Sequence, residues 1–341
     1  VLTPGNHDSA QRLGFGAGLL REGLTIRARI AEVDRPIIIP GPGGAAGLYV
    51  YALPYLDPDA ARESLPPLLA ERLGETDETP AQDPGAARSA EGGEAHEPEE
   101  AAGSDSPTAS QPPRRLPRSH EAVVSGALRL VAADLAARRA AATMRVPALV
   151  MSHAFVVGGR PTAESERDIR VGGVDSVPAG VYTGLGGSPL AERSGGLDYV
   201  ALGHLHRPQE IAQSAGPRLV YSGSPLPFSF DEAEGARNSA TKSSVLLDLA
   251  ADGVAGLERI PTPVLHRVRT LTGTMSQLLS PAFDDATGAW VRVVLRGERP
   301  PGALAALKKR FGSLLAFQHE APARTARERI AVTAAADPLR I

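Results

Sequence analysis

Four of the eight histidines lie in short polar clusters, and the residue types in these clusters are those of a metal site. His7 follows Asn6 in a Gly-Asn-His-Asp run, His153 stands alone, and His204 and His206 are two residues apart. Side chains two residues apart in an extended chain point to the same side, so His204 and His206 can face one site. Neutral imidazole binds Mn, Fe and Zn. The clusters therefore predict a metal site with ligands His153, His204 and His206 and the side-chain carbonyl of Asn6.

Such a site suits the hydrolysis of phosphate esters. Two metal ions about 3.5–4 Å apart can clamp an in-line displacement and generate hydroxide near neutral pH. His7 is next to a ligand without being an obvious ligand itself, so we expect it to act as the general acid. Asp8 either orients the His7 ring or caps the helix that follows. Ser152, next to His153, is a candidate for contact with the ligands.

Three apolar runs, which we predict to be buried strands, each end at a polar cluster. They cover residues 148–151, 197–202 and 218–221, and the last is followed by Ser-Gly-Ser-Pro. In layered α/β folds, ligands bind at strand ends, where loops are free to carry chemistry. The sequence therefore predicts an α/β fold with the metal site at one edge of its sheet.

Other elements flank these strands. Apolar residues recur at helical spacing over residues 120–143, after Ser119 as N-cap. A hairpin is predicted over residues 244–260, around Ala-Asp-Gly. Beyond Pro261-Thr262-Pro263, a small α+β unit is predicted, with strands 264–271, 290–296 and 314–319 and helices 274–279 and 302–311. The predicted domains are therefore residues 1–262 and residues 263–341, with a loose tail from residue 322.

Composition narrows the class of protein. Hydrophobic residues make up 42% of the 341 residues, enough for a sizeable core. The chain has no cysteine, which excludes disulfides and thiolate metal sites and fits a reducing cytoplasm. No apolar run is long enough to span a membrane, so no membrane partner is expected.

The charge is unevenly distributed along the chain. Residues 74–118 hold ten Asp and Glu against four Lys and Arg, with no aromatic residue, and are predicted to be a disordered insertion. Residues 263–341 hold twelve Lys and Arg against six Asp and Glu. This basic excess predicts contact with a nucleic-acid backbone, although an ordinary arginine-rich surface would look the same.

The clusters occur in the order and spacing of calcineurin-like metallophosphoesterases. Residues 198–208 and 221–232 resemble the SbcD-type nuclease subunits of bacteria in particular, as do residues 165–169 with the Gly-Gly that follows. The resemblance runs from residue 1 to about residue 271, apart from the acidic insertion. It implies an α/β (α+β) fold, a four-layer αββα sandwich lacking its first strands, followed by a small cap domain.

The resemblance also implies roles. Asn6, His153 and His204 would hold one metal ion, His206 the other, and His7 would protonate the leaving group. Members of the family use two divalent ions, with Mn2+ expected and Mg2+ or Fe2+ as alternatives. They are cytoplasmic double-strand exonucleases and single-strand endonucleases in DNA repair and recombination. Their partners are DNA and an SbcC-type SMC-like ATPase, with a homodimer inside a heterotetramer.

The sequence departs from the family at its start. The family's Asp-x-His and Gly-Asp-x-x-Asp motifs lie upstream of Gly-Asn-His-Asp, and nothing here precedes Val1. We therefore expect a partial sequence that is poorly stable and inactive alone, from a parent that is a nuclease. Two alternatives stay open: a general metallophosphoesterase acting on nucleotides or phosphoproteins, which the SbcD-like stretches disfavour, and a non-catalytic DNA-binding or scaffolding subunit.

Overall fold

A computed structural model describes residues 1–74, 115–160, 176–234 and 242–321. The helices are α1 (Ala10–Phe15), α2 (Pro58–Leu73), α3 (His120–Ala141), α4 (Ala179–Thr183), α5 (Ala191–Ser194), α6 (Phe230–Glu234), α7 (Met275–Leu278) and α8 (Ala303–Arg310). The strands are β1 (Ile37–Pro40), β2 (Ala46–Ala52), β3 (Ala148–His153), β4 (Phe155–Val156), β5 (Ser176–Val177), β6 (Tyr199–Gly203), β7 (Gln209–Ile211), β8 (Arg218–Tyr221), β9 (Ser243–Ala250), β10 (Gly253–Pro261), β11 (Val268–Gly273), β12 (Trp290–Arg296) and β13 (Leu314–Glu320).

The main sheet has six strands in the order β1-β2-β3-β6-β8-β7. Its four central strands are parallel, and β1 and β7 close the edges as antiparallel strands. The three predicted strands are confirmed as β3, β6 and β8, which lie side by side. Their carboxyl ends therefore open at the same edge of the sheet, as the prediction requires.

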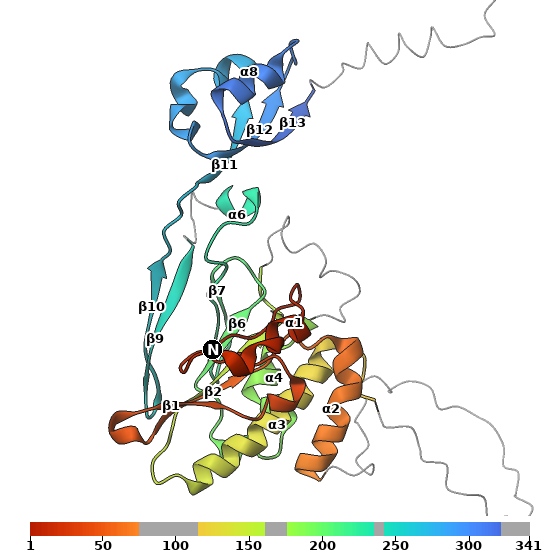
Figure 1. Ribbon diagram of the computed structural model, residues 1–341, viewed down its shortest axis with the longest axis vertical. Helices are drawn as coiled ribbons and strands as arrows, with labels where there is room; N and C mark the ends of the chain where they lie inside the picture. Colours follow the sequence, from red (N-terminus) through yellow and green to blue (C-terminus); the bar gives the residue numbers. More distant parts are fainter. Residues whose placement is uncertain (75–114, 161–175, 235–241, 322–341) are drawn as a thin grey trace, which may run out of the picture.

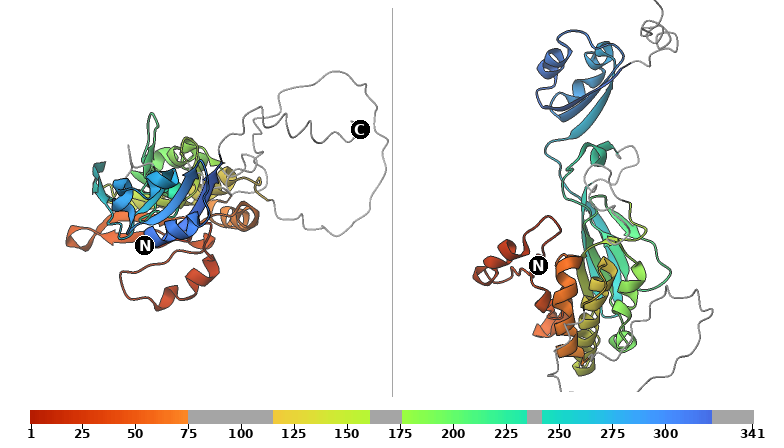
Figure 2. Two further views of the ribbon diagram at one scale, coloured as in Figure 1. Left: turned by 90° about the horizontal axis from the view of Figure 1, so that it is seen from above. Right: turned by 90° about the vertical axis from the view of Figure 1, so that its right-hand side faces the viewer.

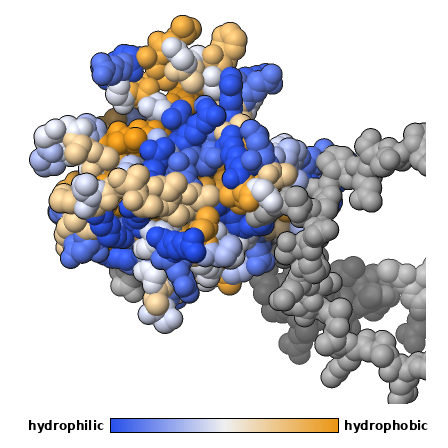
Figure 3. All heavy atoms as spheres, turned by 90° about the horizontal axis from the view of Figure 1, so that it is seen from below, coloured by the Kyte–Doolittle hydropathy of each residue, from blue (hydrophilic) through white to orange (hydrophobic). Residues whose placement is uncertain are grey.

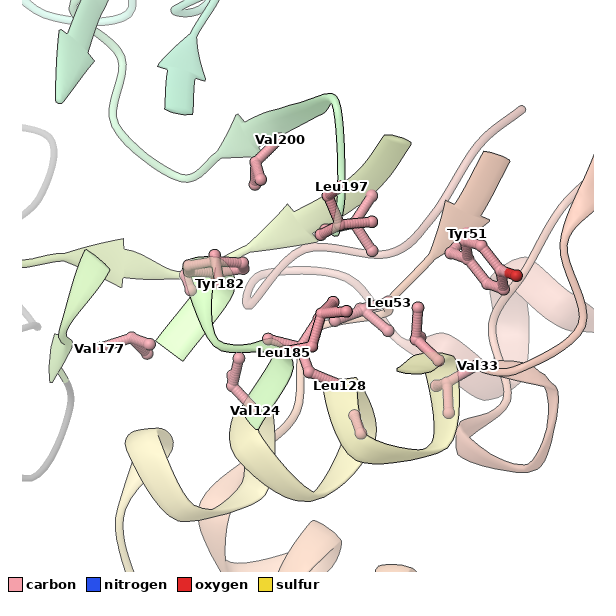
Figure 4. Packing of buried hydrophobic residues seen from close by; sticks show 14 of the residues in the cluster. Val33, Tyr51, Leu53, Val124, Leu128, Val177, Tyr182, Leu185, Leu197 and Val200 are labelled. Atoms are coloured by element: carbon pink, nitrogen blue, oxygen red, sulfur yellow. The ribbon is translucent and has the colours of Figure 1, made fainter. Parts of the chain in front are cut away.

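The core lies between this sheet and the helices that cover one of its faces. Side chains alternate between the two faces of a strand, so Ala148 and Val150 of β3 face the helices and are fully buried. The predicted helix is confirmed as α3, and the Ser119 side chain accepts a hydrogen bond from the Ala122 amide at its start. Figure 4 shows Val124 and Leu128 of α3 within this core.

The last four residues of the predicted disordered insertion, 115–118, are part of the described structure. They contact α2: the Leu116 amide donates to the Arg62 carbonyl at 3.1 Å, and Arg118 forms an ion pair with Asp59 at 2.6 Å. Leu116 also packs against the main core. A partly buried leucine anchors this stretch, which composition alone does not reveal. Residues 75–114 lie outside the described residues, as do residues 165–169 and the predicted tail.

The predicted hairpin and C-terminal unit are present. Strands β9 and β10 pair only with each other in the described chain, and they form a ribbon that runs beside the main sheet and leads to the C-terminal unit (Figure 1). The C-terminal unit lies beyond it, at one end of the molecule (Figure 2). It holds the parallel sheet β11-β12-β13 with helices α7 and α8, and it has a core of its own.

Helix α6 lies between the two parts. Its Asp231 carboxylate is 3.3 Å from the Arg292 guanidinium of β12, which also stands over the Phe230 ring at 4.9 Å. The start of α6 is therefore bound to the C-terminal unit, although its sequence directly follows the main sheet.

The described residues form a mixed α/β structure with several sheets. The four-layer αββα sandwich is not confirmed, since the described residues outside the C-terminal unit add only the β9–β10 ribbon and the short β4–β5 pair to the six-stranded sheet. No helix in the described ranges is long and apolar enough to cross a membrane. Viewed from the end opposite the C-terminal unit, the surface mixes hydrophilic and apolar residues (Figure 3).

Candidate functional site

A pocket of about 460 Å³ opens at the carboxyl ends of the central strands. It collects side chains from the loop near the start of the chain, from the end of β3 and from the loops after β6 and β8. The lining residues are Gly5, Asn6, His7, Asp8, His153, Leu202, Gly203, His204, Leu205, His206, Gly223, Ser224 and Phe228. All five predicted catalytic and metal-binding residues, Asn6, His7, His153, His204 and His206, therefore line one pocket.

Three of the predicted ligands converge on one point. His153 Nε2 lies 2.9 Å from Asn6 Oδ1 and 3.2 Å from His204 Nδ1. A Cβ atom at Gly5 would stand 2.6 Å from His153 Cε1, so only glycine lets this loop approach the imidazole so closely. Residues that are far apart in the sequence are thus held together by the neighbouring strands β3 and β6 and by a tight loop. We call Asn6, His153 and His204 the donor triad.

Burial keeps both imidazoles of the triad neutral. Desolvation lowers the pKa of His153 to about 4 and the pKa of His204 to about 3. A neutral imidazole keeps a lone pair on one ring nitrogen, which is the form that binds a metal. Near pH 7 the triad therefore offers lone pairs rather than positive charges.

His204 is also strained. Its φ is +105°, a backbone conformation that residues with a Cβ rarely adopt. Its Nε2 is buried and has no hydrogen-bond partner among the described residues. Strain and an unsatisfied buried atom both cost free energy, and such costs are found at functional sites.

His206 stands apart from the triad. Its Nδ1 is 2.9 Å from Glu232 Oε1, and its ring centroid is 5.6 Å from that of Phe228. Its side chain is 27% exposed. Its support comes from α6 and the loop before it, whereas the triad is supported by the sheet.

The predicted acid and its neighbour occupy the loop at the pocket mouth. His7 is exposed there, next to Asn6. The Asp8 carboxylate accepts a hydrogen bond from the Gly5 amide at 2.7 Å, while the helix cap expected of Asp8 is provided by Ser9, which accepts from the Arg12 amide. The capping alternative for Asp8 is therefore wrong, because Asp8 folds back on its own loop. This contact holds the Gly-Asn-His-Asp turn in shape.

Ser152 faces away from the pocket. Strand β3 alternates between buried and half-buried residues, which turns Ser152 toward the helices and His153 toward the pocket. The Ser152 hydroxyl is 2.8 Å from the buried Tyr182 hydroxyl. The observed contact of Ser152 is thus with the core.

The donor triad has the chemistry of a site for one divalent ion. Two neutral imidazole nitrogens and an amide oxygen suit Mn2+, Fe2+ or Zn2+, and the His153 nitrogen lies close to both other donor atoms. Across the described ranges, no group of three or more His, Cys, Asp or Glu side chains could hold a metal. The triad contains only two such side chains, His153 and His204, and its third donor is the Asn6 amide.

Sequence reasoning missed two polar residues behind the pocket. Glu232 contacts His206, and Lys242 contacts Glu232 at 2.5 Å. Glu232 ends the SbcD-like stretch of residues 221–232, which was the only available signal for it. Lys242 follows residues that lie outside the described chain, and no motif marks it.

Comparison with known proteins identifies relatives by name. No protein-family model matches the chain. The chain is 31% identical over 317 residues to the SbcD subunit of the SbcCD nuclease of Rhodobacter capsulatus, covering 88% of this chain and 62% of that protein. It is 46% identical over 90 residues to the protein of the same name from Bacillus subtilis, covering 26% of this chain and 20% of that protein.

The chain therefore spans less than two thirds of the length of these curated relatives. The match to the Rhodobacter protein still covers most of the chain. The resemblance of its motifs to the SbcD-type nuclease subunits is therefore confirmed by curated homologues of that name.

Proposed function

We propose that this chain is the catalytic part of a metal-dependent DNA nuclease subunit that hydrolyses phosphodiester bonds. The observation that carries the proposal is the convergence of Asn6, His153 and His204 in a pocket that also holds His7 and His206. The names of the relatives support the same class of activity.

The triad would hold one divalent ion, and His206 would help to hold a second. The ions would supply Lewis acidity and an activated water. His7, exposed at the mouth, would donate its proton to the leaving oxygen. Among the described lining residues, Asp8 is the only carboxylate, and it is engaged by Gly5. The two-metal form of the proposal therefore needs oxygen ligands beyond these residues.

The basic excess of the C-terminal unit favours DNA as the substrate. The support is weaker than the net charge of this unit suggests, because several of its arginines are paired. Arg269, Arg296 and Arg310 form ion pairs with acidic residues of the C-terminal unit. Lys308 and Lys309 on α8 remain exposed, and they are the residues that we propose contact a phosphate backbone.

The partners are proposed from the name of the relatives. That name describes one subunit of an SbcCD nuclease, which motivates an SbcC-type SMC-like ATPase as partner. A homodimer within a heterotetramer belongs to the same proposal. Mn2+ is the proposed metal, with Mg2+ or Fe2+ as alternatives.

The test uses the protein in its natural form. Its hydrolysis of linear duplex DNA, circular single-stranded DNA and nucleotide monoesters is measured with Mn2+, Mg2+ or Fe2+ and with a chelator. We expect cleavage of both DNAs, abolished by chelation and by His7→Ala, and unchanged in His266→Ala, whose ring stacks on Trp290 in the C-terminal unit.

Two results would replace the proposal. Hydrolysis of monoesters without cleavage of DNA would favour a general metallophosphoesterase. DNA binding without any hydrolysis, together with fewer than two metal ions per chain, would favour a non-catalytic subunit.

A further inference from the structure

A buried polar network lies behind His206, on the side of its ring that carries Nδ1. Its centre is Glu232, whose side chain is 1% exposed, and its only described cation is Lys242, which is 7% exposed. Ser224 and Ser229 complete it from the loop after β8. None of these four residues has a role in the proposed hydrolysis.

The two carboxylate oxygens of Glu232 accept hydrogen bonds from different donors. Oε1 accepts from His206 Nδ1 at 2.9 Å and from the Ser229 hydroxyl at 3.3 Å. Oε2 accepts from Lys242 Nζ at 2.5 Å, and from the Ser224 hydroxyl and the Phe228 amide, each at 3.2 Å. With both oxygens engaged, the carboxylate has little freedom to turn.

Lys242 contacts the backbone of His206 as well as the carboxylate of Glu232. Its ammonium donates to the His206 carbonyl at 2.9 Å and to the Ser224 hydroxyl at 2.6 Å, in addition to Glu232. The backbone and the ring of His206 are thus both tied to one buried ion pair. A buried ion pair gains little net stability over well-packed apolar residues, so stability alone does not account for its presence.

We propose that Glu232 is a positioning residue for His206, and that Lys242 fixes Glu232 in its working orientation. This inference rests on the proposed role of His206 as a metal ligand. A proton held on Nδ1 by a carboxylate leaves the lone pair on Nε2, and it sets the direction in which that lone pair points. The network thereby gives the partly exposed His206 the fixed orientation that burial gives to the donor triad.

The first measurement is the tautomer of His206, by nitrogen NMR of protein labelled at histidine, at about pH 8.5 and with a chelator present. His206→Ala identifies its signals. We expect the Nδ1–H form in the wild type and a shift toward Nε2–H, the form favoured in water, in Glu232→Ala. Glu232→Gln keeps an acceptor oxygen, so it should retain the Nδ1–H form.

The second measurement is Mn2+ affinity by calorimetry. Loss of a residue that orients a ligand typically weakens binding by about 10–100-fold, which we expect for Glu232→Ala, with a smaller loss for Glu232→Gln. The matched control is Glu298→Ala, which removes an exposed carboxylate in the C-terminal unit and should change nothing.

An unchanged tautomer in Glu232→Ala would overturn the inference, as would unchanged Mn2+ affinity in a folded protein. If Glu232→Ala does not fold, Glu232→Gln carries both readouts, and affinity equal to that of the wild type overturns the inference. Because a chelator is present, the tautomer is measured in the absence of metal. A wild type with Nδ1–H that binds no Mn2+ would therefore contradict the proposed function and leave the orienting contact supported.

Discussion

The two ends of the parallel sheet are built in opposite ways. At the amino end, the buried Asp198 accepts hydrogen bonds from the Ala148 amide at 2.7 Å, from Arg139 at 3.2 Å and from Arg145 at 2.6 Å. At the carboxyl end, His153 and His204 face one another as neutral rings, and the buried His204 Nε2 has no partner in the described chain.

The same two strands, β3 and β6, carry both arrangements. At the amino end both oxygens of the Asp198 carboxylate accept hydrogen bonds. These bonds connect β3 and the start of β6 to helix α3. At the carboxyl end the neutral rings are the ones proposed to bind a metal ion, and the backbone at His204 is strained. The difference indicates that stability and chemistry are separated along the strand direction, and it can be tested by changing one end while measuring the other.

The largest effect is expected at the amino end, from Asp198→Ala. The change leaves the Arg139 guanidinium, whose side chain is 8% exposed, without its carboxylate. Breaking a buried pair costs about 3–5 kcal/mol, which urea unfolding should detect. Mn2+ affinity of the folded protein should not change.

The matched control is Glu210→Ala, whose pair with Arg218 is about 40% exposed on both sides and should contribute less than about 1 kcal/mol. A loss of Mn2+ affinity in folded Asp198→Ala would show that the two ends are coupled.

The next effect is expected at the carboxyl end, from His153→Ala. His153 contacts both other members of the triad, so its loss should weaken Mn2+ binding by about 100-fold or more, equivalent to roughly 2.7 kcal/mol. The free energy of unfolding should fall by less than it does in Asp198→Ala. Calorimetric titration and urea unfolding of the same samples give both values, and near-normal affinity would exclude His153 as a ligand.

A pH dependence should follow from the same two imidazoles. The pKa of His153 is lowered to about 4 and that of His204 to about 3, so below about pH 6.5 the unfolded chain binds protons that the folded chain does not. Stability should therefore fall as the pH falls. Between about pH 7 and pH 6 the loss should be on the order of 1 kcal/mol, measured by urea unfolding with a chelator present.

The control for this pH dependence is the double variant His153→Ala with His204→Ala. It keeps Asp198 and Glu232 in place, so it removes only the two imidazoles. If the double variant loses as much stability as the wild type over this interval, the imidazoles are not its source.

The sequence alone predicted the strands that lead to the site better than it predicted the side-chain contacts within the site. Strands β3, β6 and β8 are parallel and largely buried, so they read as continuous apolar runs between turn residues. Strand β2 was missed, although it lies next to β3 and contributes the fully buried Tyr51 to the core. It begins with Ala46 and Gly47, two residue types that are depleted in strands, so its sequence signal is weak.

The contacts of the site depend on residues distant in sequence. Asn6 and His153 are 147 positions apart, and Lys242 reaches Glu232 from the residue just before β9. Spacing along a chain carries no information on such pairs. Asn6 could be predicted because it belongs to a motif, whereas Lys242 belongs to none. The face of Ser152 could have been predicted, because alternation along β3 places it opposite His153.

The smallest effect isolates the strain at His204, by comparing His204→Gly with His204→Ala. Both lose the ring, so both should lose Mn2+ affinity alike. At φ +105° the alanine Cβ is strained by about 1–2 kcal/mol, while glycine loses about 0.4–1 kcal/mol more backbone entropy on folding. The glycine variant should therefore be the more stable by roughly 0.5–1 kcal/mol in urea unfolding, the reverse of the usual order. If alanine is the more stable, the backbone of His204 is not held in this conformation, and the carboxyl end loses one of the two costs that set it apart from the amino end.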